Sequence, residues 1–247
     1  MNRLTLAKTC DIRTSKTPKY AVILIHGINS SSASYDDAIK FITEERKIPD
    51  LRVIAFDLLG AGKSLQSDEL NYDYEEQMEA LSNSIDELKL EIPIIMVGHS
   101  MGTFIATRYV KENPGKVQKL ILISPPIYTK ADIANPAMAV AMDAFKKTLS
   151  ERNPEIDKSK AFNNEIKYIV LNPDNYQRLI EIDVPTTLIW GELDKIIASY
   201  NIPRVLKTNK NITAILTPGT HGIKKDKYLI LARILAKMVK EQDAEAI

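Results

Sequence analysis

Cysteine is nearly absent from this chain of 247 residues. Cys10 is the single cysteine, so no disulfide can form within the chain and no paired-cysteine metal site exists. Net charge is missing too, because 33 lysines and arginines face 32 acidic residues and leave a formal charge of +1. Without a strong field of one sign, we expect neither a nucleic-acid partner nor attraction to an anionic membrane.

Long apolar runs are also lacking. No stretch approaches the roughly 18 apolar residues of a membrane-spanning helix, and residues 1–10 have no apolar segment like that of a signal peptide. Hydrophobic residues make up 45% of the chain and charged residues 26%, which is ordinary for a globular protein. We therefore expect a cytoplasmic protein without membrane contact, built as one large domain or two small ones.

The apolar residues that are present gather in short runs rich in Val, Ile and Leu. Such runs are typical of strands buried on both faces of a parallel sheet. The predicted strands cover 20–26, 51–56, 94–97, 119–124, 186–190 and 211–216, and helical patterns lie at 34–46, 74–90, 103–111 and 227–241. This alternation predicts an α/β fold, with a doubly wound, mostly parallel sheet and helices on both faces. Residues 3–16 carry a weak signal for further edge strands.

One region interrupts the alternation of strands and helices. Between 127 and 182 no apolar run matches the predicted strands in strength, and 166–171 comes nearest. Methionines and aromatics are instead spread among lysines and acids, which predicts a helical insertion. We therefore divide the chain into an α/β core, 1–126 with 183–247, and a small helical cap, 127–182.

Residues 98–102, Gly-His-Ser-Met-Gly, lie between a predicted strand and a predicted helix. A G-x-S-x-G sequence in that setting is the nucleophile-elbow pattern, in which a tight turn presents the serine hydroxyl to a pocket. The two glycines keep neighbouring side chains away from the serine. Ser100 is the predicted nucleophile.

A serine nucleophile needs a general base, and the chain has only three histidines. His99 lies inside the elbow, where its side chain should point away from Ser100, and His26 ends a strand. His221 occupies a loop between the last predicted strand and the last helix, from which it can reach across the carboxyl edge of the sheet. His221 is therefore the strongest candidate for the base.

The base in turn needs an orienting carboxylate. Asp194 follows the strand at 186–190 and so faces the same sheet edge as Ser100. Glu192 competes for this role, whereas Asp183 precedes the strand and should lie at the opposite edge. The chain order Ser100, Asp194, His221 is that of α/β-hydrolase triads.

With these motifs in place, the chain resembles the α/β-hydrolase-fold superfamily over about residues 18–240, as a carboxylesterase-like serine hydrolase. The residues that carry the resemblance, besides the elbow, are Leu-Ile-His-Gly at 24–27, Asp-Leu-Leu-Gly-Ala-Gly-Lys-Ser at 57–64, and 183–191 followed by Asp194. The insertion falls where the family carries its cap. Thr103 departs from the pattern, because a third glycine is frequent there.

The resemblance implies an oxyanion hole formed by the backbone N–H groups of Ile28 and Met101. Methionines and aromatics in the predicted cap adapt to irregular apolar groups, which makes them candidates for the pocket wall. The candidate substrate-binding side chains are His26, Met138, Met142, Phe145, Phe162 and Tyr168.

A competing interpretation takes Gly-Ala-Gly-Lys-Ser at 60–64 as a phosphate-binding loop. That loop requires a glycine where this chain has Asp57, whose carboxylate would repel a phosphate. The dinucleotide-binding G-x-G-x-x-G sequence is absent after the first strand. We therefore expect no cofactor and no metal.

The sequence predicts a serine hydrolase that cleaves a small, apolar carboxylic ester through an acyl-enzyme intermediate. Serine at position 100 argues against dehalogenases and epoxide hydrolases, whose relatives carry an aspartate nucleophile. Carbon–carbon bond hydrolase, aminopeptidase, acyltransferase and haloperoxidase chemistry stay open, as does a non-catalytic small-molecule receptor. The expected partner is the small-molecule substrate, and a homodimer is left open.

Overall fold

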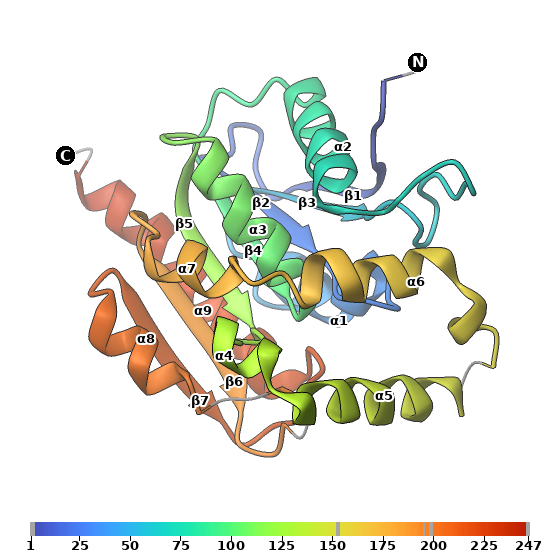
Figure 1. Cartoon of the computed structure of the whole chain (residues 1–247). Coiled ribbons are helices and arrows are strands. Elements are labelled where there is room, and N and C mark those ends of the chain that lie inside the picture. Colours follow the sequence, from blue (N-terminus) through green and yellow to red (C-terminus); the bar gives the residue numbers. More distant parts are fainter. Residues whose placement is uncertain (1–2, 152–153, 195, 198–199, 246–247) are drawn as a thin grey trace.

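The computed structural model describes residues 3–151, 154–194, 196–197 and 200–245. Within these residues, seven strands form one sheet in the order β1-β3-β2-β4-β5-β6-β7. Only β1 runs antiparallel, against β3. The strands are β1 (Ala7–Arg13), β2 (Tyr20–Ile25), β3 (Leu51–Asp57), β4 (Ile94–His99), β5 (Val117–Ile123), β6 (Thr186–Gly191) and β7 (Ile212–Thr217). The predicted α/β fold with a mostly parallel sheet is confirmed (Figure 1).

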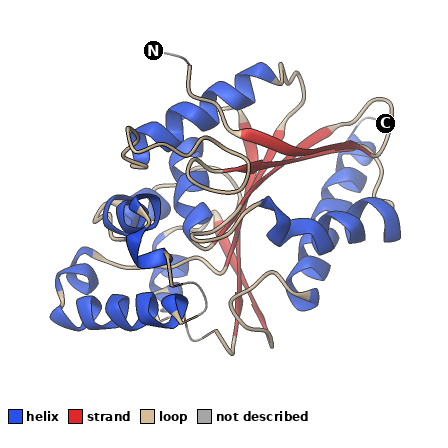
Figure 2. Ribbon diagram, turned by 90° about the vertical axis from the view of Figure 1, so that its right-hand side faces the viewer, coloured by secondary structure: helices blue, strands red, loops and turns tan. Residues whose placement is uncertain are grey.

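Helices cover both faces of this sheet, which is strongly twisted (Figure 2). One face packs against α2 (Tyr74–Glu87), α3 (Met101–Glu112) and α8 (Ile202–Thr208). The other face packs against α1 (Asp36–Lys40) and α9 (Lys225–Glu245). Because both faces are covered, β2 and β4 are buried at every position, which explains their continuous apolar sequences.

Two segments differ from the prediction. The expected helix at 34–46 consists of three joined pieces, a 3-10 turn η1 (Ser32–Tyr35), then α1, then a π-helical turn η2 (Phe41–Glu45). The chain stays helical while its hydrogen-bond spacing changes, which side-chain periodicity does not reveal. The helix α8 was not predicted.

The segment 127–182 is helical throughout its regular structure, as expected, and its described residues contain no strand. In Figures 1 and 2, α5 lies at the margin of the molecule, away from the sheet. The elements are α4 (Lys130–Ala134), α5 (Pro136–Ser150), η3 (Ile156–Lys158), α6 (Lys160–Asn164), η4 (Glu165–Val170) and α7 (Asn175–Ile180). The division of the chain into a core and a cap domain stays a prediction.

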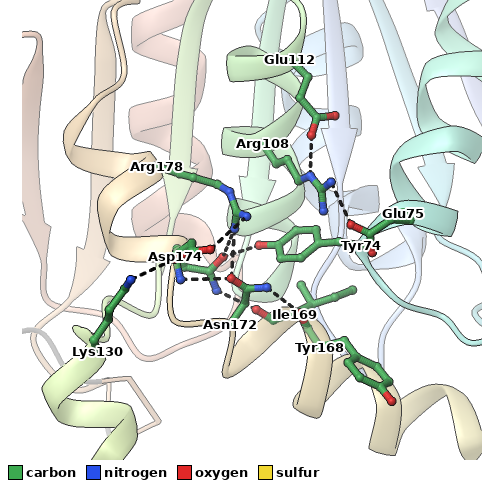
Figure 3. Close-up of polar contacts among 11 residues, drawn as sticks. Tyr74, Glu75, Arg108, Glu112, Lys130, Tyr168, Ile169, Asn172, Asp174 and Arg178 are labelled. Atoms are coloured by element: carbon green, nitrogen blue, oxygen red, sulfur yellow. Dashed lines mark hydrogen bonds and ion pairs between the residues drawn. The ribbon is translucent and has the colours of Figure 1, made fainter.

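Tyr74 of α2 fastens this helical segment to the sheet-covering helices (Figure 3). Its buried hydroxyl donates a hydrogen bond to Asn175 Oδ1 at the start of α7. Its ring lies between two guanidinium groups, with Arg108 4.7 Å and Arg178 5.2 Å from the ring centroid. The Asn175 amide donates in turn to the carbonyl oxygen of Ile169, at 2.6 Å. Buried hydrogen bonds thus join the C-terminal part of the segment, η4 and α7, to α2.

Candidate active site

Ser100 lies in the turn between β4 and α3, with φ 51° and ψ −122°. A non-glycine residue in this region costs on the order of 1–3 kcal/mol, so the surrounding structure must hold it there. The Ser100 N–H donates to the carbonyl oxygen of Ile123 at 3.0 Å. Close packing explains both glycines, because a Cβ on Gly98 would lie 2.5 Å from the Gly102 carbonyl oxygen. A Cβ on Gly102 would overlap the backbone at the end of β2.

Asp194 and His221 meet at the carboxyl edge of the sheet. Asp194 follows β6, and His221 lies in the loop between β7 and α9. The distance from His221 Nδ1 to Asp194 Oδ2 is 2.9 Å, and their side chains are 14% and 1% exposed. An ionised carboxylate only accepts, so Nδ1 carries the proton and Nε2 keeps a lone pair for a hydroxyl proton. In the neutral imidazole, this is the tautomer that a general base requires.

Hydrogen bonds keep Asp194 ionised. Burial alone would raise the pKa of its carboxyl group, but hydrogen bonds from His221 and from the backbone N–H groups of Ile196 and Ile197 hold that pKa below its ordinary value. Asp194 Oδ1 accepts the backbone bonds at 3.0 and 3.3 Å, which leaves Oδ2 for the imidazole.

The third predicted member of the triad lies beside this pair but is not bonded to it. Within the described residues, neither the Ser100 hydroxyl nor His221 Nε2 makes a hydrogen bond. The ring of His99, next to the nucleophile, lies 5.1 Å from the ring of His221, centroid to centroid, so the base loop abuts the elbow. Catalytic hydrogen bonds often form only in the substrate complex. The triad role of Ser100, Asp194 and His221 stays a prediction.

The loop that carries His221 is held by buried donors that the sequence did not reveal. Lys227 Nζ, on a side chain with no exposure, donates to the carbonyl oxygens of both neighbours of His221. The carbonyl oxygen of His221 itself accepts from Ser124 Oγ at 2.8 Å and His99 Nε2 at 3.0 Å. The carbonyl groups of residues 220–222 are therefore held by the side chains of Lys227, Ser124 and His99. The imidazole of His221 is positioned through these contacts to its backbone.

His99 is a structural histidine in this arrangement. Burial, and then the nearby imidazole of His221, lower the pKa of His99 to about 3, so its ring is neutral near neutral pH. A carbonyl oxygen can only accept, so the His99 proton sits on Nε2, and Nδ1 has no partner among the described residues. The expectation that His99 is not the base stays a prediction.

The loop 26–28 lies against the nucleophile. A Cβ on Gly27 would come 2.9 Å from Ser100 Cβ, which shows how closely the two segments approach. Met101 is the first residue of α3, and N–H groups in the first turn of a helix have no acceptor within the helix. Of the two predicted donors, Met101 follows Ser100 in the chain and Ile28 follows Gly27, which lies against Ser100, and their oxyanion role stays a prediction.

The buried side chains of His26 and Asp57 interact with backbone groups near the ends of β2 and β3. His26 is 1% exposed, its Nε2 accepts from the Leu58 N–H at 2.9 Å, and its Nδ1 lies 2.7 Å from the Gly27 carbonyl oxygen. Asp57 accepts backbone N–H bonds from Ser32 and Lys63, each at 2.8 Å. The 57–64 loop is therefore organised around a carboxylate. Substrate contact by His26 stays a prediction.

Two cavities flank the helical segment. The first, here called the apolar cavity, has a volume of about 710 Å³. Met138, Met142 and Phe145 of α5 line one side, and Ile196 and Ile197, next to Asp194, line another. Three of the predicted cap residues thus line the same cavity as Ile196 and Ile197, in the loop that follows Asp194.

The second, here called the polar cavity, has a volume of about 680 Å³ and lies at the other side, beside the 26–34 loop. Its lining includes Gly27, Asn29, Ser30, Glu165 and the predicted Phe162. Tyr168, also predicted, is 38% exposed and stacks with the Lys167 ammonium group, which lies 4.6 Å from the ring centroid. Among the described cavity linings, Tyr168 occurs in neither cavity.

Within the described residues, no helix has the length and apolar character needed to cross a membrane. The same residues contain no group of three or more His, Cys, Asp or Glu side chains placed to hold a metal ion.

A strained serine between a central strand and a helix, with an Asp–His pair at the same sheet edge, belongs to the α/β-hydrolase fold. Solved structures agree. An esterase from Exiguobacterium antarcticum matches with a TM-score of 0.69 at 20% identity, covering 96% of this chain and 99% of that one. A carboxylesterase structure from Nitrososphaera gargenis matches with a TM-score of 0.72 at 18% identity, covering 98% of each chain. At these identities, the likeness shows the fold.

The sequence model of the hydrolase family described as serine aminopeptidase, S33, matches residues 16–179, more than half of the chain. The protein belongs to this family of the α/β-hydrolase superfamily, which confirms the resemblance. It is 31% identical over 134 residues to the probable lysophospholipase BODYGUARD 2 of Arabidopsis thaliana, and 25% identical over 162 residues to the monoglyceride lipase of Homo sapiens. These matches cover 54% and 64% of this chain, but only 28% and 52% of the relatives.

Proposed function

We propose that this protein is a serine esterase that cleaves a small carboxylic ester with an apolar acyl group, using Ser100, His221 and Asp194. The hydrogen bond between His221 Nδ1 and Asp194 carries this proposal, because it selects the tautomer of the neutral imidazole in which Nε2 has the lone pair, at the sheet edge where Ser100 is presented. The family membership and the similarity to a lipase, a probable lysophospholipase and esterases support ester chemistry.

The reaction follows from these positions. Ser100 Oγ attacks the ester carbonyl carbon while His221 Nε2 takes the hydroxyl proton, and Asp194 stabilises the imidazolium. The N–H groups of Ile28 and Met101 stabilise the negative charge that develops on the carbonyl oxygen. As the carbon–oxygen bond breaks, His221 returns the proton to the departing alcohol and the acyl group stays on Ser100. Water activated by His221 then releases the carboxylic acid.

The apolar cavity supports an apolar acyl group as the bound part of the substrate. Its methionine and phenylalanine side chains on α5 offer apolar contact area that tolerates irregular shapes. Ile196 and Ile197, whose backbone N–H groups bond to Asp194, line the cavity, so it adjoins the loop of the proposed acid.

The decisive experiment combines fluorophosphonate labelling with turnover of acyl esters of graded chain length, with amide and carbon–carbon substrates in the same panel. The parent should label on Ser100 and hydrolyse esters, and Ser100→Ala should lose both. His221→Ala should cost nearly as much as Ser100→Ala, because triad members act as a unit. Ester turnover by Ser100→Ala at the parent rate, or faster cleavage of amides than of esters, would overturn the proposal.

The assignment of the acid has its own control two residues away. Asp194→Asn should lower kcat by about a thousandfold or more, since the amide no longer accepts from His221 Nδ1 as a carboxylate does. Glu192→Gln, at an exposed side chain in the same turn, should leave kcat within about twofold. The reverse result would move the acid to Glu192.

A further inference from the structure

The first turn of α9 carries a pair of opposite charges beside the loop of His221. Asp226 and Lys227 are neighbours in the chain, and Lys227 Nζ lies 3.8 Å from Asp226 Oδ2. The Lys227 side chain has no exposure, and that of Asp226 is 17% exposed. Among the described residues, Lys227 is the only lysine or arginine that is buried. A buried ammonium group is costly unless it has partners, so its position needs a reason.

The partners of Lys227 lie in the loop that carries the proposed base. Its ammonium group donates to the carbonyl oxygens of Thr220 and Gly222, the residues on either side of His221. Burial lowers the pKa of Lys227, and the negative charges of Asp226 and Asp194 oppose this shift. Lys227 thus has a counter-charge beside it, and it holds the backbone before and after the imidazole.

Asp226 contacts the beginning of the same loop. Its Oδ2 accepts a hydrogen bond from Thr217 Oγ1 at 2.6 Å, at the end of β7. Gly219 lies against the same carboxylate, because a Cβ on Gly219 would collide with Asp226 Oδ2. The two charged residues therefore hold different parts of the loop 217–222, Asp226 its beginning and Lys227 its end.

The beginning of the loop is also joined to the turn that carries the proposed acid. The carbonyl oxygen of Gly219 accepts from the Leu193 N–H at 3.0 Å. The backbones approach so closely that a Cβ on Gly191 would collide with the Gly219 carbonyl group. The segments that precede Asp194 and His221 are therefore in direct contact, so a shift of the loop would change the geometry of both side chains.

We infer that Asp226 and Lys227 are positioning residues for the reaction, and that they hold the imidazole of His221 against Asp194 through the backbone of the loop 217–222. The inference rests on the proposed function and extends its machinery to the first turn of α9. Neither residue lines the apolar or the polar cavity. Their loss should therefore slow the chemical steps and leave substrate affinity unchanged.

The test replaces Lys227 with methionine, which has a similar length but donates no hydrogen bond. Lys227→Met should lower kcat for propyl butyrate by about ten- to a hundredfold, because a displacement of about 1 Å in a catalytic group can cost that much. Lys225→Met is the matched control, at an exposed lysine that begins α9, and should leave kcat within about twofold. Calorimetry in the Ser100→Ala background should give the same Kd for the ester with and without Lys227→Met.

Proton NMR at low temperature reads the position of His221 without turnover. The Nδ1–H proton that binds Asp194 should give a low-field resonance in the parent, assigned by its absence from His221→Ala. Lys227→Met should weaken or remove this resonance, and Lys225→Met should retain it. Asp226→Ala, at a partly exposed side chain, should weaken it and lower kcat several-fold, and it provides the test if Lys227→Met does not fold.

The two readouts separate this inference from the proposed function. Loss of the resonance in Lys227→Met would support the positioning role even if the parent cleaved no ester. In a parent that cleaves esters, an unchanged resonance and a kcat within twofold in the folded Lys227→Met or Asp226→Ala variant would overturn the inference. A weaker affinity for the ester with an unchanged kcat, or an equal loss in Lys225→Met, would overturn it as well.

Discussion

The two ends of the helical segment 127–182 are built in opposite ways. At the first end, α5 spans 15 residues and has no buried residue, although eight of its residues line the apolar cavity. At the other end, η4 and α7 bury six residues, and Asn175 is joined to Tyr74 of the core. The end formed by η4 and α7 is packed against the core, whereas α5 mainly lines a cavity.

We expect these two ends to affect different properties of the protein, one its stability and the other its choice of substrate. A side chain that is already buried against the core cannot change without loss of packing, whereas the side chains of α5 face a cavity and solvent. We therefore expect changes at the buried apolar residues of η4, at α7 and at their partners to act mainly on the free energy of unfolding. Changes on α5 should act mainly on which ester is cleaved.

The largest effect is expected from removing Tyr74, which hydrogen-bonds to Asn175 at the start of α7. Tyr74→Ala should lower the free energy of unfolding by about 3–5 kcal/mol, because it deletes a buried ring and leaves Asn175 without its donor. Phe145→Ala, the matched aromatic deletion on half-buried α5, should cost less than half as much. Urea denaturation of both variants measures the difference. Equal losses would break the comparison.

The charge of Glu165 should make the pinned end sensitive to pH. Its pKa is about 8 in the folded protein against an ordinary value of 4.5, so between these values the folded state holds a proton that the unfolded state has lost. The contribution of this group to stability is therefore fully present below about pH 4.5 and is lost as pH rises toward 8.

Glu165→Gln should remove this contribution, so its free energy of unfolding should fall less steeply than that of the parent between pH 5 and pH 8. The difference in slope can reach about 1.4 kcal/mol per pH unit, the value for one proton. Denaturation at several pH values measures both slopes, and Glu151→Gln serves as the exposed control. Parallel slopes for the parent and Glu165→Gln would show that this carboxyl group is not held neutral.

Part of the fold and of the candidate site could be predicted from the sequence alone. The strands β2 and β4 were predictable because burial on both faces leaves a continuous apolar run, and Ser100 was predictable because the elbow needs glycines at fixed spacing. Asp194 and His221 could be ranked by their place after strands, and the structure brings them within hydrogen-bond distance. All of this information is local or depends on chain order.

The missing features depend on partners far along the chain. Glu165 is buried against Gln77, 88 residues away, and Tyr74 bonds Asn175, 101 residues away, so no nearby pattern announces either contact. Lys227 stands among other lysines at 224 and 225, yet only Lys227 is buried beneath the loop of His221. A buried polar group looks like a surface residue until its neighbours are known.

The smallest expected effect on stability, and the clearest on specificity, lies on α5. Met142→Ala should enlarge the apolar cavity while changing the free energy of unfolding by no more than about 1 kcal/mol, since the side chain is not buried in the core. The ratio of kcat/KM for long and short acyl esters should rise several-fold, because added space admits a longer chain. The rate on the shortest ester should change least. Val140→Ala, at a side chain 70% exposed on the same helix, should leave the ratio unchanged. If Met142→Ala destabilises the protein without moving the chain-length preference, α5 is part of the core packing and the distinction between the two ends fails.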